Sequence, residues 1–362
     1  MIIYKIVLTL FIFGLSTTIK IPESTETEYN IGKGSQPEIS VDADGTIRMV
    51  YGIKNGKERD LYFVTSTDGG KSFSEPLMLG NFSNMGLGMG RGPQITSSKD
   101  FTIVTVGDHF GNLHALRLNN SSNEWSKPVK VNDTDSTALE ALSAILTYGE
   151  NKVFTVWLDL RLGKVNNLYG SFSKDGGLTW SKNQLVYEGK QDGICDCCKP
   201  SLAMDKNGRI YVMFRNKMNG ARNMYVIHSD DGGKHFSEAK KQGLGDYMIN
   251  GCPMDGGDLS VDSKGKLTTI WRREKEVFFS TTDKPETKLG NGKTPVLVQT
   301  KTGTAMAWEQ DENIQFRNPE GSKIHSLGVG KYPKLAQITG QKPATICAFE
   351  RDGNVIVKTV EL

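Results

Sequence analysis

The sequence predicts an all-β fold, a β-propeller with seven four-stranded blades favoured and six as the alternative. Composition is the first observation behind this prediction. Gly numbers 40 and Pro only 12, and Ser, Thr, Asn and Asp crowd between short apolar runs. Such punctuation is typical of many short strands joined by tight turns. The other two observations are sequence repeats, each marking a fixed place in a repeated module.

The first repeat is an octet that follows a strand-like run at residues 66–73, 173–180 and 229–236. Its pattern is Ser-x-Asp-Gly-Gly, then two variable residues and an aromatic residue. The Asp can accept hydrogen bonds from backbone N–H groups of a hairpin turn, and the paired glycines permit positive φ. The aromatic ring is then expected to pack in the core. Residues 120–126 look like a degenerate copy.

The second repeat is a Gly-rich opening that leads through Pro into a short apolar strand, seen at residues 31–39, 88–95, 289–297 and 327–335, with looser copies at 198–202 and 256–259. Openings near residues 37, 93, 142, 200, 257, 295 and 333 define modules of roughly 47 residues, the usual length of a blade. Residues 25–31 lie just before the first opening, in the place that a fourth strand occupies before each later opening. We therefore expect them to pair with the last blade and close the ring, which removes an open edge.

The N-terminus has the pattern of an export signal. Lys5 precedes an apolar run of about ten residues, 6–15, which is followed by Ser and Thr. Such a run is short of the roughly 20 residues that a membrane span needs and fits a signal peptide, with an uncleaved anchor as the alternative. We expect residues 1–20 to be a signal peptide, 21–362 to form a single propeller domain, and the protein to be secreted or periplasmic, with no stable membrane span after signal removal.

Charge narrows the range of partners. The chain has 44 basic and 41 acidic residues, a net charge of +3. This balance argues against a nucleic-acid partner, which would call for a strong basic excess.

One face of the propeller is the expected site. In an antiparallel blade, the start of the first strand and the end of the second share a face, and the octet turns lie on the other. The turns are therefore expected to be scaffold. The candidate face collects charged residues that suit an anionic ligand such as a carboxylate, with internal Arg–Asp pairing as the alternative. They are Arg91, Arg161, Arg215, Arg272, Arg273, Asp159, Asp255, Asp258 and Glu309.

The octets resemble the Asp box, or BNR repeat, of the sialidase (neuraminidase) superfamily, and the resemblance covers nearly the whole chain after the signal. It implies three arginines that hold a substrate carboxylate, an Asp acid/base, and a Tyr nucleophile activated by a Glu. By approximate position it points to Tyr332 as the nucleophile and Glu309 or Glu350 as its partner. It likewise points to Asp159 or Asp255 as the acid, and to Arg215 and Arg272 as two of the arginines.

The chain departs from that pattern in two ways. The family's first arginine lies two residues before Pro in the first blade, where this chain has Ser35 before Pro37. Arg91 has the right spacing before Pro93 but opens the second module. In addition, family members have six blades. The function is therefore open between a glycosidase acting on an anionic sugar, a non-catalytic glycan- or protein-binding propeller, and a metal- or redox-linked propeller.

Four cysteines lie in two successive module openings. Cys195, Cys197 and Cys198 occupy one, and Cys252 occupies the next, so neighbouring blades should bring them together. Disulfides are one interpretation for an exported chain. A thiolate site for Cu(I) or Zn is the other, although no cofactor is firmly indicated. Cys347 lies in an apolar run and is expected to be a buried free thiol.

Overall fold

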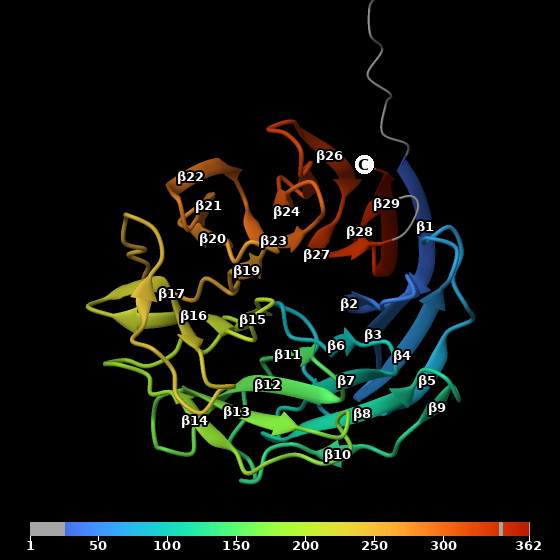
Figure 1. The fold of residues 1–362 in the computed structure, drawn as a ribbon, viewed down its shortest axis with the longest axis horizontal. Coiled ribbons are helices and arrows are strands. Elements are labelled where there is room, and N and C mark those ends of the chain that lie inside the picture. The colour runs from blue at the N-terminus through green and yellow to red at the C-terminus, as the bar shows by residue number, and fades with distance from the viewer. Residues whose placement is uncertain (1–25, 340–342, 362) are drawn as a thin grey trace, which may run out of the picture.

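The computed structural model describes residues 26–339 and 343–361. The predicted signal peptide, residues 1–20, lies outside them. The described chain is all β and forms seven small antiparallel sheets, arranged as blades around a central axis (Figure 1). The prediction of seven blades is thus confirmed, and the six-bladed alternative is not realised. In the described part of the chain, no helix is long and apolar enough to cross a membrane.

The blades follow one another along the chain, each running from an inner to an outer strand. The first blade holds β2 (Ser35–Val41), β3 (Ile47–Asn55), β4 (Glu58–Ser66) and β5 (Leu77–Asn81). The second holds β6 (Gln94–Ser97), β7 (Phe101–Gly107), β8 (Leu113–Asn119) and a broken outer strand, β9 (Glu124–Trp125) and β10 (Val129–Lys130). The third holds β11 (Ser143–Tyr148), β12 (Lys152–Asp159), β13 (Asn167–Ser173) and β14 (Gln184–Tyr187).

The remaining blades repeat this order. The fourth holds β15 (Ser201–Met204), β16 (Ile210–Met218), β17 (Ala221–Ser229) and β18 (Lys240–Lys241). The fifth holds β19 (Asp258–Val261), β20 (Leu267–Arg273), β21 (Glu276–Thr281) and β22 (Lys284–Asn291). The sixth holds β23 (Lys293–Gln299), β24 (Thr304–Gln310), β25 (Asn313–Arg317) and β26 (Ile324–Val329). The seventh holds β27 (Lys331–Ile338), β28 (Ala344–Arg351), β29 (Asn354–Glu361) and β1 (Glu26–Lys33).

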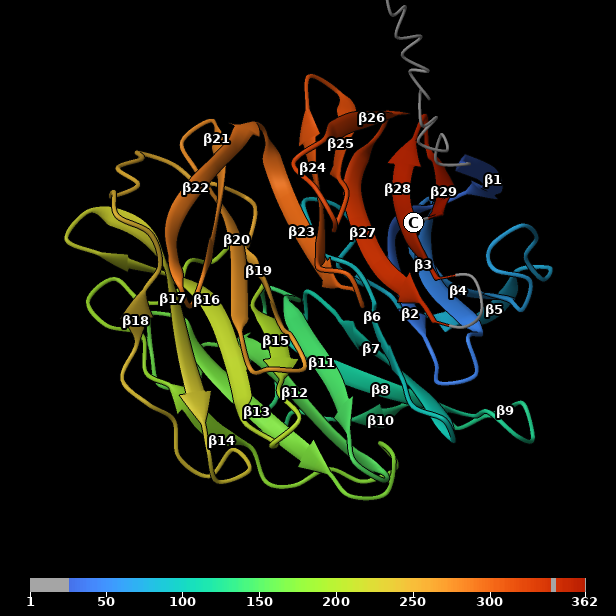
Figure 2. The ribbon, with the colours of Figure 1, turned by 45° about the horizontal axis from the view of Figure 1, so that its top comes forward.

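The first and last strands of the chain close the ring. β1 pairs antiparallel with β29, in a register that sets Glu26 opposite Val360, and the two strands lie side by side in Figures 1 and 2. This is the closure that the sequence predicts. It leaves no unpaired side on β29, which is where an outer strand would otherwise present free N–H and C=O groups.

The core lies between neighbouring blades. One cluster joins Ile47 and Val64 of the first blade to Ile346 and Val357 of the seventh. Another joins the third blade to the fourth, with Phe154 packed near Phe214. Inner strands also contact their neighbours all around the ring. Because each sheet buries its faces against the next, no blade has a separate hydrophobic core.

The octet turns have the predicted geometry. In the first blade the Oδ1 atom of Asp68 accepts hydrogen bonds of 3.0 Å from the backbone N–H groups of Lys71 and Ser72. Gly70 has a φ of 87°, and a Cβ placed there would lie 2.7 Å from Oγ1 of Thr359 in the seventh blade. The second glycine is therefore required both for the turn and for close packing against the next blade. These turns lie between third and fourth strands, opposite the module openings.

Candidate functional site

The inner strands surround a central cavity of about 190 Å³ that is lined by charged side chains. In it, the Oε2 atom of Glu38 lies 3.1 Å from Nζ of Lys199 and 2.7 Å from Nζ of Lys334. Lys199 also donates a hydrogen bond to Oε1 of Gln94. Burial lowers the pKa of Lys199 to about 8, against the opposing effect of the Glu38 charge. Two lysines thus lie inside the channel with one carboxylate bound directly between them.

Sequence reasoning missed these lysines, although a signal was present. Glu38 and Lys334 directly follow the opening prolines of their modules, and Lys199 directly precedes one. A charged residue beside the opening proline therefore marks the channel wall. Asp258, which was predicted, lines the same cavity. Its carboxylate accepts hydrogen bonds from the N–H groups of Leu259 and Leu297, and burial raises its pKa.

A second cavity of about 210 Å³ adjoins the channel and forms its mouth. Four residues line both cavities, so the two are continuous: Met254, Asp255, Thr294 and Tyr332. The mouth pocket is completed by Met89, Pro253, Arg272 and Lys293. It therefore presents an aromatic ring, a carboxyl group and two cations to a bound molecule.

The backbone of the mouth pocket is strained. Met89, Met254, Thr294 and Tyr332 have φ values of 55°, 60°, 50° and 55°, in the left-handed region that favours glycine. The pairing register shifts next to two of them, between Lys331 and Lys334 and between Lys293 and Val296. Such conformations are costly and cluster at binding and catalytic sites, and these four come from different blades.

Both candidate partners of Tyr332, Glu309 and Glu350, act on it electrostatically. Burial raises the pKa of Tyr332, and the charges of Glu350 and Glu309 raise it further. Glu350 is engaged elsewhere, because its Oε1 atom accepts two hydrogen bonds of 2.7 Å from Gln36. Glu309 is 3% exposed and binds Lys293 at 2.9 Å through Oε1, while its buried Oε2 atom has no hydrogen-bond partner. Glu309 therefore keeps one carboxylate oxygen free of hydrogen bonds, whereas Glu350 is held by Gln36.

Asp255 is the predicted acid that lines the pocket. Its Oδ2 atom accepts a hydrogen bond of 3.1 Å from the N–H group of Thr294 and lies 3.4 Å from Nη1 of Arg272. Its Oδ1 atom lies 3.7 Å from Nη2 of Arg215. Burial raises the pKa of Asp255, although both arginines oppose this effect. A carboxyl group with a raised pKa can act as a proton donor near neutral pH.

The five predicted arginines do not form a single clamp. Of these, Arg272 lines the mouth pocket. Arg215 is 1% exposed and donates hydrogen bonds to the carbonyl oxygens of Arg222 and Arg272. It therefore holds the backbone of the pocket residue Arg272 in place. Arg91 pairs with Glu140 at 2.8 Å. Arg273 forms a bidentate pair with Glu286.

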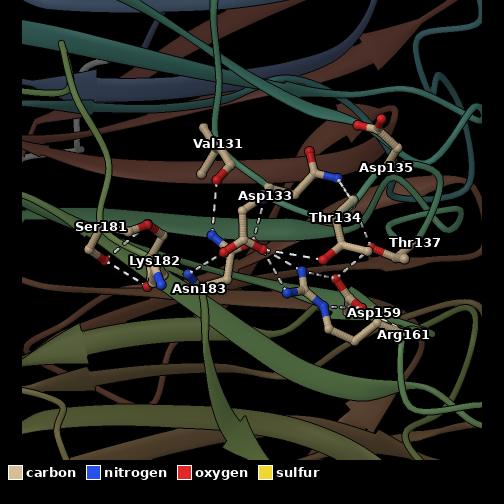
Figure 3. A network of polar contacts seen from close by, with 12 residues as sticks. Val131, Asp133, Thr134, Asp135, Thr137, Asp159, Arg161, Ser181, Lys182 and Asn183 are labelled. Carbon is tan, nitrogen blue, oxygen red and sulfur yellow. Dashed lines mark hydrogen bonds and ion pairs between the residues drawn. The ribbon is translucent and has the colours of Figure 1, made fainter.

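The fifth arginine, Arg161, belongs to a separate polar network with Asp159, the other predicted acid (Figure 3). Its guanidinium bridges Asp159 and Asp133 and also donates to Asn183. Asp159 is fully buried, and neighbouring hydrogen bonds and the charge of Arg161 lower its pKa despite burial. This network links the end of β12, at Asp159, to the loops that contain Asp133 and Asn183.

The four clustered cysteines lie together, as neighbouring openings predict. Cys197 and Cys252 form a disulfide, while Cys195 and Cys198 are buried thiols. Arg222 donates a hydrogen bond of 3.0 Å to Sγ of Cys195. The hydrogen bond from Cys198, together with the charges of Arg222 and Arg215, lowers the pKa of Cys195 to about 6 against the effect of burial. The fifth cysteine, Cys347, is a buried free thiol, as expected.

Comparison with known proteins supports the fold. Residues 106–249 match a family model described as a BNR repeat-like domain. No curated protein matches the chain by sequence. Among solved structures, an α-L-arabinanase from Penicillium chrysogenum complexed with arabinobiose has 11% identity and a TM-score of 0.54, over 94% of this chain and 98% of its own. A polysaccharide lyase of the ulvan lyase family PL25, bound to -[GlcA(1-4)Rha3S]-, has 10% identity and a TM-score of 0.55, over 93% and 96%.

A Trypanosoma rangeli sialidase in complex with sialic acid has 12% identity and a TM-score of 0.53, over 94% of this chain and 59% of its own. Identities this low establish likeness of fold alone. Together with the octet turns and the family match over residues 106–249, they define the class of fold. It is a seven-bladed β-propeller with BNR-type repeats, similar in fold to sialidases.

Proposed function

We propose that the protein binds an anionic sugar at the mouth pocket. The observation that carries this proposal is the joint placement of Tyr332, Arg272 and Lys293 around one cavity, above a channel that contains Lys199 and Lys334. Guanidinium and ammonium groups suit carboxylate or sulfate groups of a sugar. Concave sites with a few convergent polar groups are the usual location of small-molecule binding.

The comparisons support this class of ligand. The structures similar in fold were solved with arabinobiose, with sialic acid and with an oligosaccharide containing GlcA. The separation of the five arginines argues against a three-arginine clamp of the sialidase type. We therefore assign the pocket to acidic sugars in general, rather than to sialic acid in particular.

A second function, cleavage of a glycosidic bond, is favoured by the environments of Tyr332 and Asp255. Asp255, with its raised pKa, would protonate the leaving oxygen. Tyr332 would attack the anomeric carbon and pass its proton to Glu309, whose Oε2 atom is free to accept it. A neutral Tyr avoids the repulsion that a carboxylate nucleophile would experience from an anionic sugar.

Calorimetry with sialic acid, glucuronate and glucose tests the binding proposal. We expect both acids to bind more tightly than glucose. Arg272→Ala should weaken their binding at least about 10-fold, as expected for loss of a charge-assisted contact. The control is Arg59→Ala, because Arg59 donates to backbone carbonyls of an exposed turn in the first blade. Equal affinity for glucose and the acids, or no effect of Arg272→Ala, would contradict the proposal.

Turnover is tested separately with a panel of fluorogenic anionic glycosides. Tyr332→Phe should abolish dye release and leave sugar affinity within about threefold, because a nucleophile is needed for chemistry rather than binding. Tyr62→Phe is the matched control, since Tyr62 stacks on Tyr51 within the first blade. If Tyr332→Phe retains full turnover, the assigned nucleophile is wrong.

We also propose that the protein is exported. The signal pattern of residues 1–20 supports this, and so does the Cys197–Cys252 disulfide, because disulfides persist mainly in oxidising compartments. Cell fractionation of a tagged chain tests the proposal. Recovery in the cytosolic fraction with all five cysteines reduced would contradict it.

A further inference from the structure

Three sulfur atoms from one blade opening form a compact group beside the mouth pocket, and a fourth, from the next opening, adjoins them. The Sγ atom of Cys195 lies 3.6 Å from those of Cys197 and Cys198, and the latter two are 3.8 Å apart. The Sγ atom of Cys252 lies within 4.8 Å of those of Cys195 and Cys197 but not of that of Cys198, and it is bonded to Cys197 in the disulfide. Met254 packs against this cluster.

These separations match those of a thiolate metal site. Zn²⁺ binds thiolate sulfur at about 2.3 Å in tetrahedral geometry, which places neighbouring sulfurs about 3.8 Å apart. The three distances among Cys195, Cys197 and Cys198 are within 0.2 Å of this value. Cys195, Cys197 and Cys198 are therefore already spaced to share a cation, and the exposed Cys252 side chain would turn toward it once the bond to Cys197 is reduced.

The surrounding charge also favours thiolates. Four thiolates and one cation carry a net negative charge, which is costly to bury without compensation. Arg222 donates a hydrogen bond to Sγ of Cys195, and the buried Arg215 donates to the carbonyl oxygen of Arg222. Sulfur atoms that accept hydrogen bonds from a fixed cation are held in position for a metal.

The donor set defines the kind of metal. Among the described residues, the one group of side chains placed to hold an ion consists of cysteines. Thiolate-only sites select soft cations such as Zn²⁺ and Cu⁺ over Mg²⁺ and Ca²⁺. Cys252 is exposed, so a cation and a reductant can both reach the cluster from solvent.

We propose that Cys195, Cys197, Cys198 and Cys252 bind a single thiophilic cation, Zn²⁺ or Cu⁺, when the Cys197–Cys252 disulfide is reduced. A dithiol or phosphine reductant supplies the two electrons of this reduction and is itself oxidised, while solvent supplies two protons to the new thiols. The cation then displaces the thiol protons into solvent. The disulfide and metal-bound forms exclude one another, because both use the sulfurs of Cys197 and Cys252.

This site would act on the mouth pocket through the chain. Cys252 directly precedes Pro253, Met254 and Asp255, which line the pocket. A metal would fix this segment to the segment of residues 195–198 on the neighbouring blade. The inference does not depend on the proposed sugar ligand, because metal binding is measured without any sugar.

Metal titration of the whole protein tests the proposal. The protein is reduced with a phosphine, freed of reductant without oxygen, and titrated with Zn²⁺ against a chromophoric chelator and with Cu⁺ against bicinchoninate. One equivalent of the preferred cation should bind, and the relative affinities identify which cation that is. Substitution with Co²⁺ should give the charge-transfer bands of a thiolate site. A reduced, folded protein that binds less than half an equivalent of either cation would overturn the proposal.

Variants identify the ligands. Cys195→Ser and Cys252→Ser should each weaken binding at least about 100-fold, which exceeds the usual loss on removing a supporting contact. Cys252 is exposed, so its variant reports on the metal even if the buried Cys195→Ser variant fails to fold. Cys347→Ser is the matched control and should keep full affinity. Equal binding by the oxidised protein or by Cys252→Ser would contradict the assignment.

Discussion

Arg161 and Asp159 bind each other through two hydrogen bonds of 2.9 Å, from Nε to Oδ1 and from Nη2 to Oδ2. Trp157 and Thr137 donate two more to the same carboxylate. Asp159 is fully buried and its oxygens are occupied, so the pair has the character of a structural link. The other predicted acid, Asp255, keeps a buried Oδ1 atom with no hydrogen-bond partner.

Replacement of Asp159 should therefore affect stability and leave ligand binding unchanged. We expect Asp159→Asn to lower the free energy of unfolding by about 2 kcal/mol, because it removes a buried carboxylate that accepts several hydrogen bonds and leaves Arg161 paired with Asp133 alone. Chemical denaturation measures this loss. The control is Asp192→Asn, which removes an exposed partner of Lys217 and should cost less than about 1 kcal/mol. A stable Asp159→Asn protein with altered sugar affinity would show that Asp159 acts in the site.

The channel charge should make anion binding depend on pH. The pKa of Lys199 is lowered to about 8 by burial, so this side chain is cationic below pH 8 and neutral above it. The charges facing it are Glu38, Asp258 and Lys334. Affinity for an anionic sugar should therefore fall as pH rises from 7 to 9. Calorimetry across this range measures the effect.

Two lysine variants distinguish this effect from a general one. Lys199→Met should remove the fall in affinity between pH 7 and 9. Lys164→Met, at an exposed position, should keep it. A fall that persists unchanged in Lys199→Met would show that another group is responsible.

The octet turns should contribute to stability from the face opposite the site. Asp175 accepts hydrogen bonds from the N–H groups of Leu178 and Thr179 and from Oγ of Ser173. Asp175→Ala should lower the free energy of unfolding by about 1 kcal/mol, in line with the loss of turn hydrogen bonds, without changing sugar affinity. Thermal unfolding measures this, and Lys174→Ala, at an exposed position, serves as control.

The same turns predict sensitivity to acid. Hydrogen bonds from Ser72, Ser66 and Lys71 lower the pKa of Asp68 to about 2, below its value of about 3.9 in an unfolded chain. The stabilisation is present above pH 4 and is lost as pH falls from about 4 to 2. Stability measured against pH should therefore decline less steeply for Asp68→Asn in this range. An identical slope would contradict the assignment.

Ring closure gives a further prediction. A chain that lacks residues 26–33 should unfold at a lower temperature and associate, because β29 would present an unpaired edge. A chain that begins at residue 26 is the control. Light scattering and thermal unfolding distinguish the two, and equal behaviour would mean that β1 adds nothing to the closed ring.

The repeats account for how much of the fold could be predicted. Octets and openings recur in register with the blades, so the blade count and the pairing of β1 with β29 followed from spacing. The contacts of the site could be predicted less well from the sequence. Arg91 pairs with Glu140 and Arg273 with Glu286, and neither partner belongs to a repeat. The contact of Lys199 with Glu38 joins the first and fourth blades, so it depends on the shape of the closed ring. Asp255 was placed on the candidate face by its position after a module opening, and the resemblance alone pointed to Tyr332.

The pairing of Glu26 with Val360 also sets the order of events during biosynthesis. The first strand of the ring is made early and must wait for nearly the whole chain before its partner exists. Synthesis proceeds at about 5–20 residues per second, so the wait lasts tens of seconds. In that interval the blades can form only an open arc. A ring closed by its first and last strands cannot reach its native state until β29 has left the ribosome, so the finished blades must remain soluble as an open arc until then.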